Sequence, residues 1–158
     1  MAPDDALPRG ESGRHSRVSR DDSRALEQIF KAYDIRGIYP EELNESASYR
    51  VGAGYARSGI VPVGSRIVLG RDMRESSDAL FEAFAAGAGG NGLASVDIGL
   101  CTTPMFYFAV NELQAAGGAM ITASHNPGTY NGFKLVRESC PTSSRTKGIA
   151  TLGWGSSL

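Results

Sequence analysis

Short apolar segments alternate with helical stripes through the middle of the chain, and this alternation restricts the fold more than any other feature. An apolar residue at every fourth position predicts a helix that ends near Gly59. Ser77 is expected to cap a second helix, and Thr103 a third, with Pro104 at its first position and Gly117-Gly118 at its end. The inward residues expected of the first two helices are Leu43, Ala47, Val51, Tyr55, Leu80, Phe81, Phe84 and Ala88.

Four short apolar segments between these helices are predicted to be β-strands. They cover residues 66–69, 95–98, 119–122 and 133–136. Strands that alternate with helices are joined by right-handed crossovers. The pattern therefore predicts an α/β fold, a three-layer α/β/α sandwich with a mostly parallel sheet. The residues expected in the buried sheet are Ile67, Val68, Leu69, Val96, Ile98, Met120 and Ile121.

The two ends of the chain lack this pattern. Residues 1–24 are rich in Pro, Ser, Arg and Asp, and we expect a disordered N-terminal extension because they can bury little apolar surface. The domain is expected to cover residues 25–137. Residues 138–158 are rich in Ser, Thr and Gly without periodicity, so an atypical, disordered tail is expected, as a truncation or frameshift would produce.

Charge and composition exclude several classes of partner. The 16 basic and 17 acidic residues give a net charge of −1, so no nucleic-acid partner and no membrane partner is expected. The longest apolar stretch, Leu93 to Val110, contains Asp97 and Pro104, which argues against a transmembrane span. The N-terminus has no secretory pattern, and two cysteines cannot build a disulfide framework. These features favour a cytoplasmic protein.

The run from Gly87 to Gly92 fits the dinucleotide-binding pattern G-x-G-x-x-G letter for letter. That fingerprint must follow a strand and open a helix. Here it follows a predicted helix and precedes a predicted strand. We therefore interpret the run as a helix end and a turn.

Ser124 follows the predicted strand 119–122 directly. The carboxyl ends of parallel strands are where ligands bind in α/β sheets. The flanking residues do not form G-x-S-x-G, which argues against a hydrolase of the nucleophile-elbow type. From the residues alone, Ser124 and His125 also fit an ordinary turn, which Asn126-Pro127 favours.

Four motifs resemble those of the α-D-phosphohexomutases. TASHNP at 122–127, followed by YNGFK at 130–134, is similar to the active-site serine loop of that family. KAYDIRG at 31–37 resembles the N-terminal signature of its phosphomannomutase/phosphoglucomutase branch, and GRD at 70–72 and TTP at 102–104 match shorter motifs. The resemblance covers about residues 28–137 and implies the first of the family's four domains.

The resemblance implies an enzyme, an intramolecular phosphotransferase that interconverts hexose 1-phosphate and hexose 6-phosphate. A phosphoryl group on Ser124 would pass to the sugar phosphate and give a bisphosphorylated intermediate. Lys134 would act as the general acid/base, and His125 would orient groups or shuttle protons. Tyr33, Arg36 and Asn126 would bind phosphate, and Arg71 and Asp72 are expected as a structural pair that supports the serine loop.

The resemblance also implies cofactors and partners. The cofactors are Mg²⁺ and a hexose bisphosphate activator, and the partners are small-molecule hexose phosphates. The only metal ligand in this chain would be Ser124, through its phosphate, because the family's metal carboxylates come from its second domain. The family's C-terminal domains are expected in the full-length protein, and the fragment alone is expected to be inactive. The alternative is a stand-alone, non-catalytic domain that binds sugar phosphates or a partner. The choice between mannose and glucose phosphates stays open.

Overall fold

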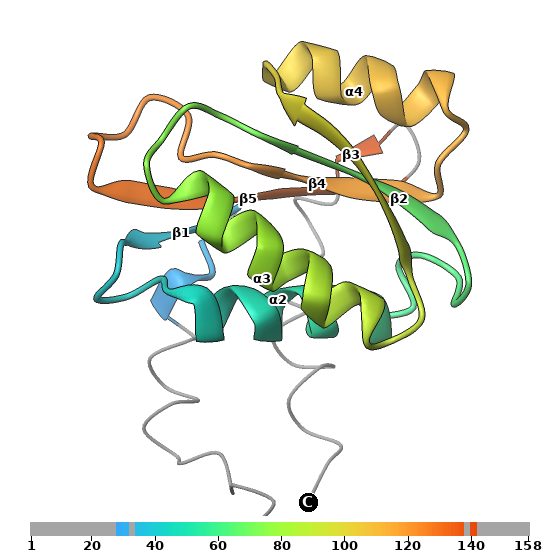
Figure 1. Ribbon diagram of the computed structural model, residues 1–158, viewed down its shortest axis with the longest axis horizontal. Helices are drawn as coiled ribbons and strands as arrows, with labels where there is room; N and C mark the ends of the chain where they lie inside the picture. The colour runs from blue at the N-terminus through green and yellow to red at the C-terminus, as the bar shows by residue number, and fades with distance from the viewer. Residues whose placement is uncertain (1–27, 32–33, 138–139, 142–158) are drawn as a thin grey trace, which may run out of the picture.

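The computed structural model describes residues 28–31, 34–137 and 140–141. Two helices cover one face of a central sheet and a third helix covers the other face (Figure 1), so the predicted α/β/α class is confirmed. The predictions for residues 1–24 and for most of 138–158 lie outside the described residues. The elements in chain order are β1 (Ile35–Ile38), α2 (Glu45–Arg57), β2 (Arg66–Arg71), α3 (Ser77–Gly89), β3 (Ala94–Leu100), α4 (Thr103–Glu112), β4 (Gly117–Ile121), β5 (Tyr130–Arg137) and β6 (Cys140–Pro141).

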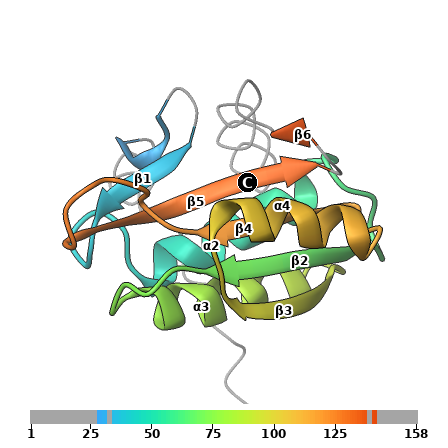
Figure 2. The same cartoon turned by 90° about the horizontal axis from the view of Figure 1, so that it is seen from above.

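The sheet is mixed and has a parallel core. Its strand order is β1-β5-β4-β2-β3, with β6 beside β5 (Figure 2). The strands β4, β2 and β3 are parallel, as predicted, whereas β5 runs antiparallel to β4 and to β1. Only residues 122–129 connect β4 to β5, and a parallel pairing needs a crossover of about a dozen residues or more. The strand predicted at 133–136 is therefore antiparallel, and β1 is a strand that the pattern did not predict.

The helix caps lie one residue earlier than predicted. Ser76, not Ser77, is the N-cap of α3, and the Ser77 hydroxyl instead donates to Asp72 Oδ1 at 2.7 Å. Thr102 caps α4, and its hydroxyl accepts a hydrogen bond from the backbone N–H of Met105. Thr102 has the extended backbone of a typical N-cap, whereas Ser76 has a helical backbone and forms no side-chain cap hydrogen bond.

Gly117-Gly118 does not end α4, as predicted, but begins β4. The helix ends at Glu112. A Cβ atom at Gly118 would lie 2.2 Å from the Val68 carbonyl oxygen, and one at Gly117 would lie 2.4 Å from the Tyr55 hydroxyl. The two glycines therefore allow β4 to enter the sheet between its neighbours and under α2.

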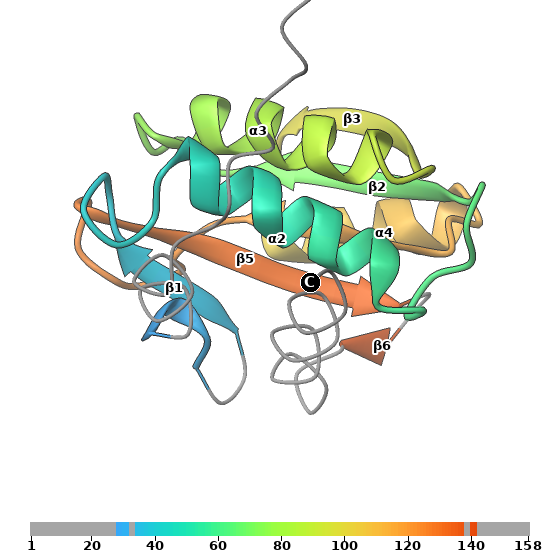
Figure 3. The ribbon, with the colours of Figure 1, turned by 90° about the horizontal axis from the view of Figure 1, so that it is seen from below.

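The helices α2 and α3 lie side by side under the sheet (Figure 3) and approach each other through two glycines. A Cβ at Gly87 would lie 2.0 Å from the Tyr49 carbonyl oxygen, and one at Gly52 would lie 2.2 Å from the Phe84 carbonyl oxygen. Gly87 therefore marks a helix contact and not the helix end that we predicted. The rest of the glycine run does end α3, because the last helical residue is Gly89 and the chain then turns.

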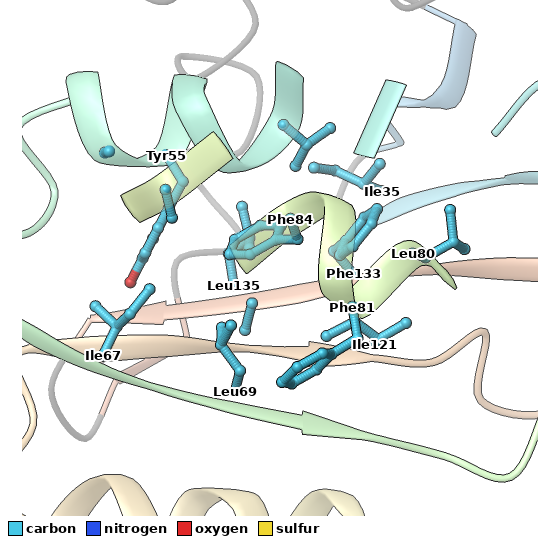
Figure 4. Packing of buried hydrophobic residues seen from close by; sticks show 14 of the residues in the cluster. Ile35, Tyr55, Ile67, Leu69, Leu80, Phe81, Phe84, Ile121, Phe133 and Leu135 are labelled. Atoms are coloured by element: carbon cyan, nitrogen blue, oxygen red, sulfur yellow. The ribbon is translucent and has the colours of Figure 1, made fainter. Parts of the chain in front are cut away.

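The main core lies between the sheet and the helices α2 and α3 (Figure 4). The ring of Phe84 packs between Tyr55 and Phe133, with centroid distances of 6.1 and 5.4 Å. All predicted inward residues of the first two helices are buried there. Val96 and Ile98, predicted in the buried sheet, are only half-buried because β3 is an edge strand.

A smaller core lies under α4 on the opposite face of the sheet. It includes Val68, Phe106, Val110, Met120 and Val136. Across the ranges that the structure describes, no helix is both long and apolar enough to cross a membrane.

Candidate active site at the carboxyl edge of the parallel strands

Ser124 lies at the edge of the sheet where the three parallel strands end. It comes three residues after β4, its side chain is exposed, and its φ is +57°, in the left-handed region that non-glycine residues rarely adopt. The turn is stabilised locally: the Ser124 N–H donates to Thr122 Oγ1 at 2.9 Å, and the Asn126 N–H donates to the Ala123 carbonyl at 3.1 Å. The backbone is held while the hydroxyl stays open to a ligand.

Arg36 and Asn126 meet beside this turn, although 90 residues separate them in the sequence. Arg36 Nη1 donates to Asn126 Oδ1 at 3.3 Å, and Nη2 forms a 2.6 Å ion pair with Asp34. Arg36 Nε is buried and has no acceptor among the described residues. On β5, Gly132 lies opposite Arg36, and a Cβ there would lie 3.1 Å from Arg36 Cγ. Gly132 therefore makes room for the arginine.

Lys134 lies on the same face of the sheet as Arg36. Along β5 the core residues Phe133 and Leu135 face α2 and α3, so Lys134 and Gly132 face the α4 side. Lys134 is half-buried, and its strand is joined to the serine turn where the Thr122 N–H donates to the Gly132 carbonyl at 2.9 Å. Two cationic side chains therefore share the sheet face that borders the serine.

Two of the predicted site residues remain to be placed. His125 is exposed and adjoins Ser124 in the turn. Tyr33 lies outside the described residues. The structure thus brings Ser124, His125, Asn126 and Arg36 together at one edge, with Lys134 on the adjoining sheet face.

Arg74 also contacts the serine turn, although it was not among the predicted site residues. Its Nη1 donates to the carbonyl oxygens of Pro127 and Tyr130 at 2.7 and 2.9 Å. Its Nη2 donates to those of Ser124 and Asn126 at 3.1 and 2.7 Å. Its position shortly after a strand of the parallel core could have marked Arg74 as a candidate site residue. Its partners are backbone carbonyl oxygens, however, and no pattern of side chains in the sequence indicates them. Below, residues 122–130 are called the serine loop.

The expected pairing of Arg71 with Asp72 is wrong. Arg71 donates to Asp78 and to Asp97, the latter at 2.9 Å. Asp72 pairs instead with Arg74, whose Nε lies 3.1 Å from Asp72 Oδ2. Successive residues at a strand end point in opposite directions, so only Asp72 faces the serine loop. Asp72 supports that loop, but its partner is Arg74.

Cys101 is a second reactive group near this edge, after the end of β3. Its sulfur lies 3.6 Å from the Met120 sulfur. Burial raises the pKa of the Cys101 thiol, which favours the neutral and weakly nucleophilic form. The exposed hydroxyl of Ser124 is therefore the better candidate for covalent chemistry.

The acidic side chains do not form a metal site by themselves. Within the described ranges, no group of three or more His, Cys, Asp or Glu residues could hold a metal ion. Mg²⁺ prefers about six oxygen ligands, and the carboxylates described near this edge, Asp34 and Asp72, are each paired with an arginine. The residues present therefore do not fit a complete Mg²⁺ site.

Comparison with known proteins supports one family. A family model described as phosphoglucomutase/phosphomannomutase, alpha/beta/alpha domain I, matches residues 27–152. Proteins named phosphohexose mutases from Xanthomonas campestris and phosphomannomutase from Escherichia coli are 52% and 47% identical, over 74% and 76% of this chain. Each alignment covers 26% of the relative, so the chain spans about a quarter of their length.

A solved structure shows the same fold. The crystal structure of a phosphoglucomutase/phosphomannomutase family protein from Burkholderia thailandensis superimposes with a TM-score of 0.70 at 31% identity. The match covers 79% of this chain and 29% of that one. Because the family model matches most of the chain and the fold agrees, the chain belongs to the phosphoglucomutase/phosphomannomutase family, and its matched residues correspond to the first α/β/α domain.

Proposed function

We propose that this chain is the serine-bearing domain of a phosphomannomutase/phosphoglucomutase, which interconverts hexose 1-phosphate and hexose 6-phosphate. The observation that supports this most is the exposed Ser124 in a left-handed turn beside Arg36. The phosphoryl group leaves Ser124 Oγ for the free hydroxyl of the sugar phosphate and forms a bisphosphorylated sugar. The sugar's other phosphoryl group then returns to Ser124, so the serine ends as it began.

Charge and proton transfer are divided among the neighbouring residues. A phosphoserine carries about −1.5 to −2 charges at pH 7, so its neighbours must supply positive charge. Arg36 is suited to bind phosphate because its guanidinium presents planar donors, and Asn126 orients it. Lys134 accepts the proton of the attacking sugar hydroxyl and returns one in the reverse step, with His125 beside the serine. Tyr33 is proposed as a further phosphate ligand.

The reaction depends on groups beyond this chain. Ser124, through its phosphate, would supply one ligand to Mg²⁺, which would stabilise charge on the phosphoryl oxygens, and no acidic cluster in the described part of the chain would complete the site. A hexose bisphosphate would prime Ser124. Loss of a single electrostatic element typically costs about 10²–10³ in rate. We therefore expect no measurable turnover from the 158-residue chain alone.

A hybrid enzyme tests this function. Residues 1–137 are joined in frame to the C-terminal part of the 52% identical Xanthomonas relative. Formation of hexose 6-phosphate is then followed from glucose 1-phosphate or mannose 1-phosphate, with Mg²⁺ and a trace of hexose bisphosphate. Ser124→Ala should reduce kcat at least about 1,000-fold because alanine has no hydroxyl to carry the phosphoryl group. The control is Ser46→Ala, which changes an exposed serine on α2.

Three results would contradict the proposal. An active Ser124→Ala hybrid would remove the serine from the mechanism. Turnover by the unextended chain would show that further domains are not needed. An inactive wild-type hybrid that still binds hexose phosphate would favour the non-catalytic alternative.

A further inference from the structure

We propose that Arg74 is the positioning residue that holds Ser124 in its reactive place, a role that rests on the proposed function. A guanidinium has five N–H donors in a fixed plane. Arg74 uses all five: four point to carbonyl oxygens of the serine loop and the fifth points to Asp72. The Arg74 side chain is only 13% exposed. One side chain therefore sets the path of the loop backbone on both sides of the turn.

Arg74 differs from the proposed phosphate ligand Arg36 because all its side-chain donors are already used. Because every N–H of Arg74 already has a protein acceptor, none remains for a phosphoryl oxygen. Arg36, in contrast, has a buried Nε without an acceptor in the described part of the chain. Arg74 therefore acts through the loop and not on the substrate.

The arrangement also orients the loop for an anion. The Ser124–His125 peptide is trans, so the His125 N–H points opposite to the Ser124 carbonyl. Since Arg74 draws that carbonyl inward, the His125 N–H faces away from Arg74, and no described residue accepts its hydrogen. A phosphoryl group on Ser124 then meets a donor where a carbonyl oxygen would repel it.

The same network reaches the strand that carries Lys134. Asp72 Oδ1 accepts hydrogen bonds from the Ser77 hydroxyl at 2.7 Å and from the backbone N–H of Arg74 at 3.2 Å. Asn131, which is fully buried, donates from Nδ2 to the Ser77 hydroxyl at 3.0 Å. Asn131 and Lys134 both lie on β5. The chain of contacts therefore relates the position of the serine loop to that of the proposed general acid/base.

Arg74→Lys in the hybrid enzyme separates positioning from binding. Lysine keeps the charge, but its three donors share one nitrogen and cannot reach four carbonyl oxygens and a carboxylate. A misplacement of about 1 Å costs about 100-fold in rate, so kcat should fall about 100-fold while KM stays within about threefold. The control is Arg66→Lys at the other end of β2, where Nη2 donates to the Leu113 carbonyl, and its kcat should stay within about twofold.

A measurement on the unaltered 158-residue chain does not depend on activity or on the folding of a variant. In ¹⁵N NMR spectra, the Arg74 guanidinium should give separate, slowly exchanging Nη–H signals because all its hydrogens are bound. In Arg74→Lys the amides of Asn126 and Tyr130, which are bonded within the loop, should exchange at least about tenfold faster.

The outcomes are separable. Averaged Arg74 signals in the unaltered chain would overturn the inference whatever the activity. An increase in KM at constant kcat would make Arg74 a substrate ligand, and an unchanged kcat would remove the positioning role. An active Ser124→Ala hybrid would refute the proposed function alone, because the Arg74 signals would still report the contacts.

Discussion

Replacing Gly132 by alanine should displace β1 and the arginine it carries. A Cβ at Gly132 would lie 2.1 Å from the Ile35 carbonyl oxygen, whereas such contacts are rarely shorter than 3.0 Å, so β1 must move by about 1 Å. Overpacking of this kind typically costs about 1–3 kcal/mol, and stretched β1–β5 hydrogen bonds add to it. We expect a loss of about 2–3 kcal/mol of unfolding free energy. Arg36 moves with β1, so its hydrogen bond to Asn126 is lost.

Urea unfolding followed by circular dichroism measures this loss. With an m-value of about 2 kcal/mol/M, the midpoint should fall by about 1 M or more. The matched control is Gly128→Ala in the serine loop, because a Cβ there has no neighbour within 4 Å. Its midpoint should change by less than about 0.3 M. Equal midpoints for Gly132→Ala and Gly128→Ala would refute the steric argument.

Two further substitutions test the core. In Gly87→Ala the new Cβ would lie 2.0 Å from the Tyr49 carbonyl oxygen, whereas in the control Gly89→Ala it meets nothing within 4 Å. The free energy of unfolding of Gly87→Ala should therefore be about 2–3 kcal/mol lower than that of Gly89→Ala. Equal urea midpoints for the two variants would contradict this. Tyr55→Phe should cost about 1–2 kcal/mol because the hydroxyl donates to the buried Val136 carbonyl at 2.6 Å. Burial raises the pKa of Tyr55 above its ordinary 10.0, so its contribution to stability is complete below pH 10 and decreases progressively as the pH rises above that value. The stability difference between the wild type and Tyr55→Phe should therefore shrink in urea titrations above pH 10.

Local periodicity was sufficient to predict the helix α2 and the strands β2 and β4. Of the predicted residues, Ala47, Val51 and Tyr55 are buried on α2, and Leu43 is buried just before the helix begins. The run Ile67 to Leu69 is buried in the sheet. These predictions succeed because a repeat of about four residues or a short apolar run shows which residues are buried, whatever distant part of the chain they pack against. The place of Ser124 after a strand of the parallel core followed from the same pattern.

Strand direction and close helix contacts depended on the assembled fold. The apolar run at β5 looks the same in a parallel or an antiparallel sheet, and the short connection from β4 makes it antiparallel. Gly87 belongs to a run that ends a helix, yet its own role is to let α3 touch α2. A glycine in the sequence indicates only that space or freedom is needed, and the packing partner decides which.

The residues and their order were enough to predict the family resemblance, the position of Ser124 at a strand end, and the kinds of side chain expected near it. Only the tertiary structure assigned the support of the serine loop to Arg74. The carbonyl oxygens that Arg74 binds lie 50 to 56 residues away in the chain. Every residue type has such a carbonyl, so no pattern of side chains marks these acceptors. They become a binding site for Arg74 only when the fold brings the end of β2 beside the loop that follows β4.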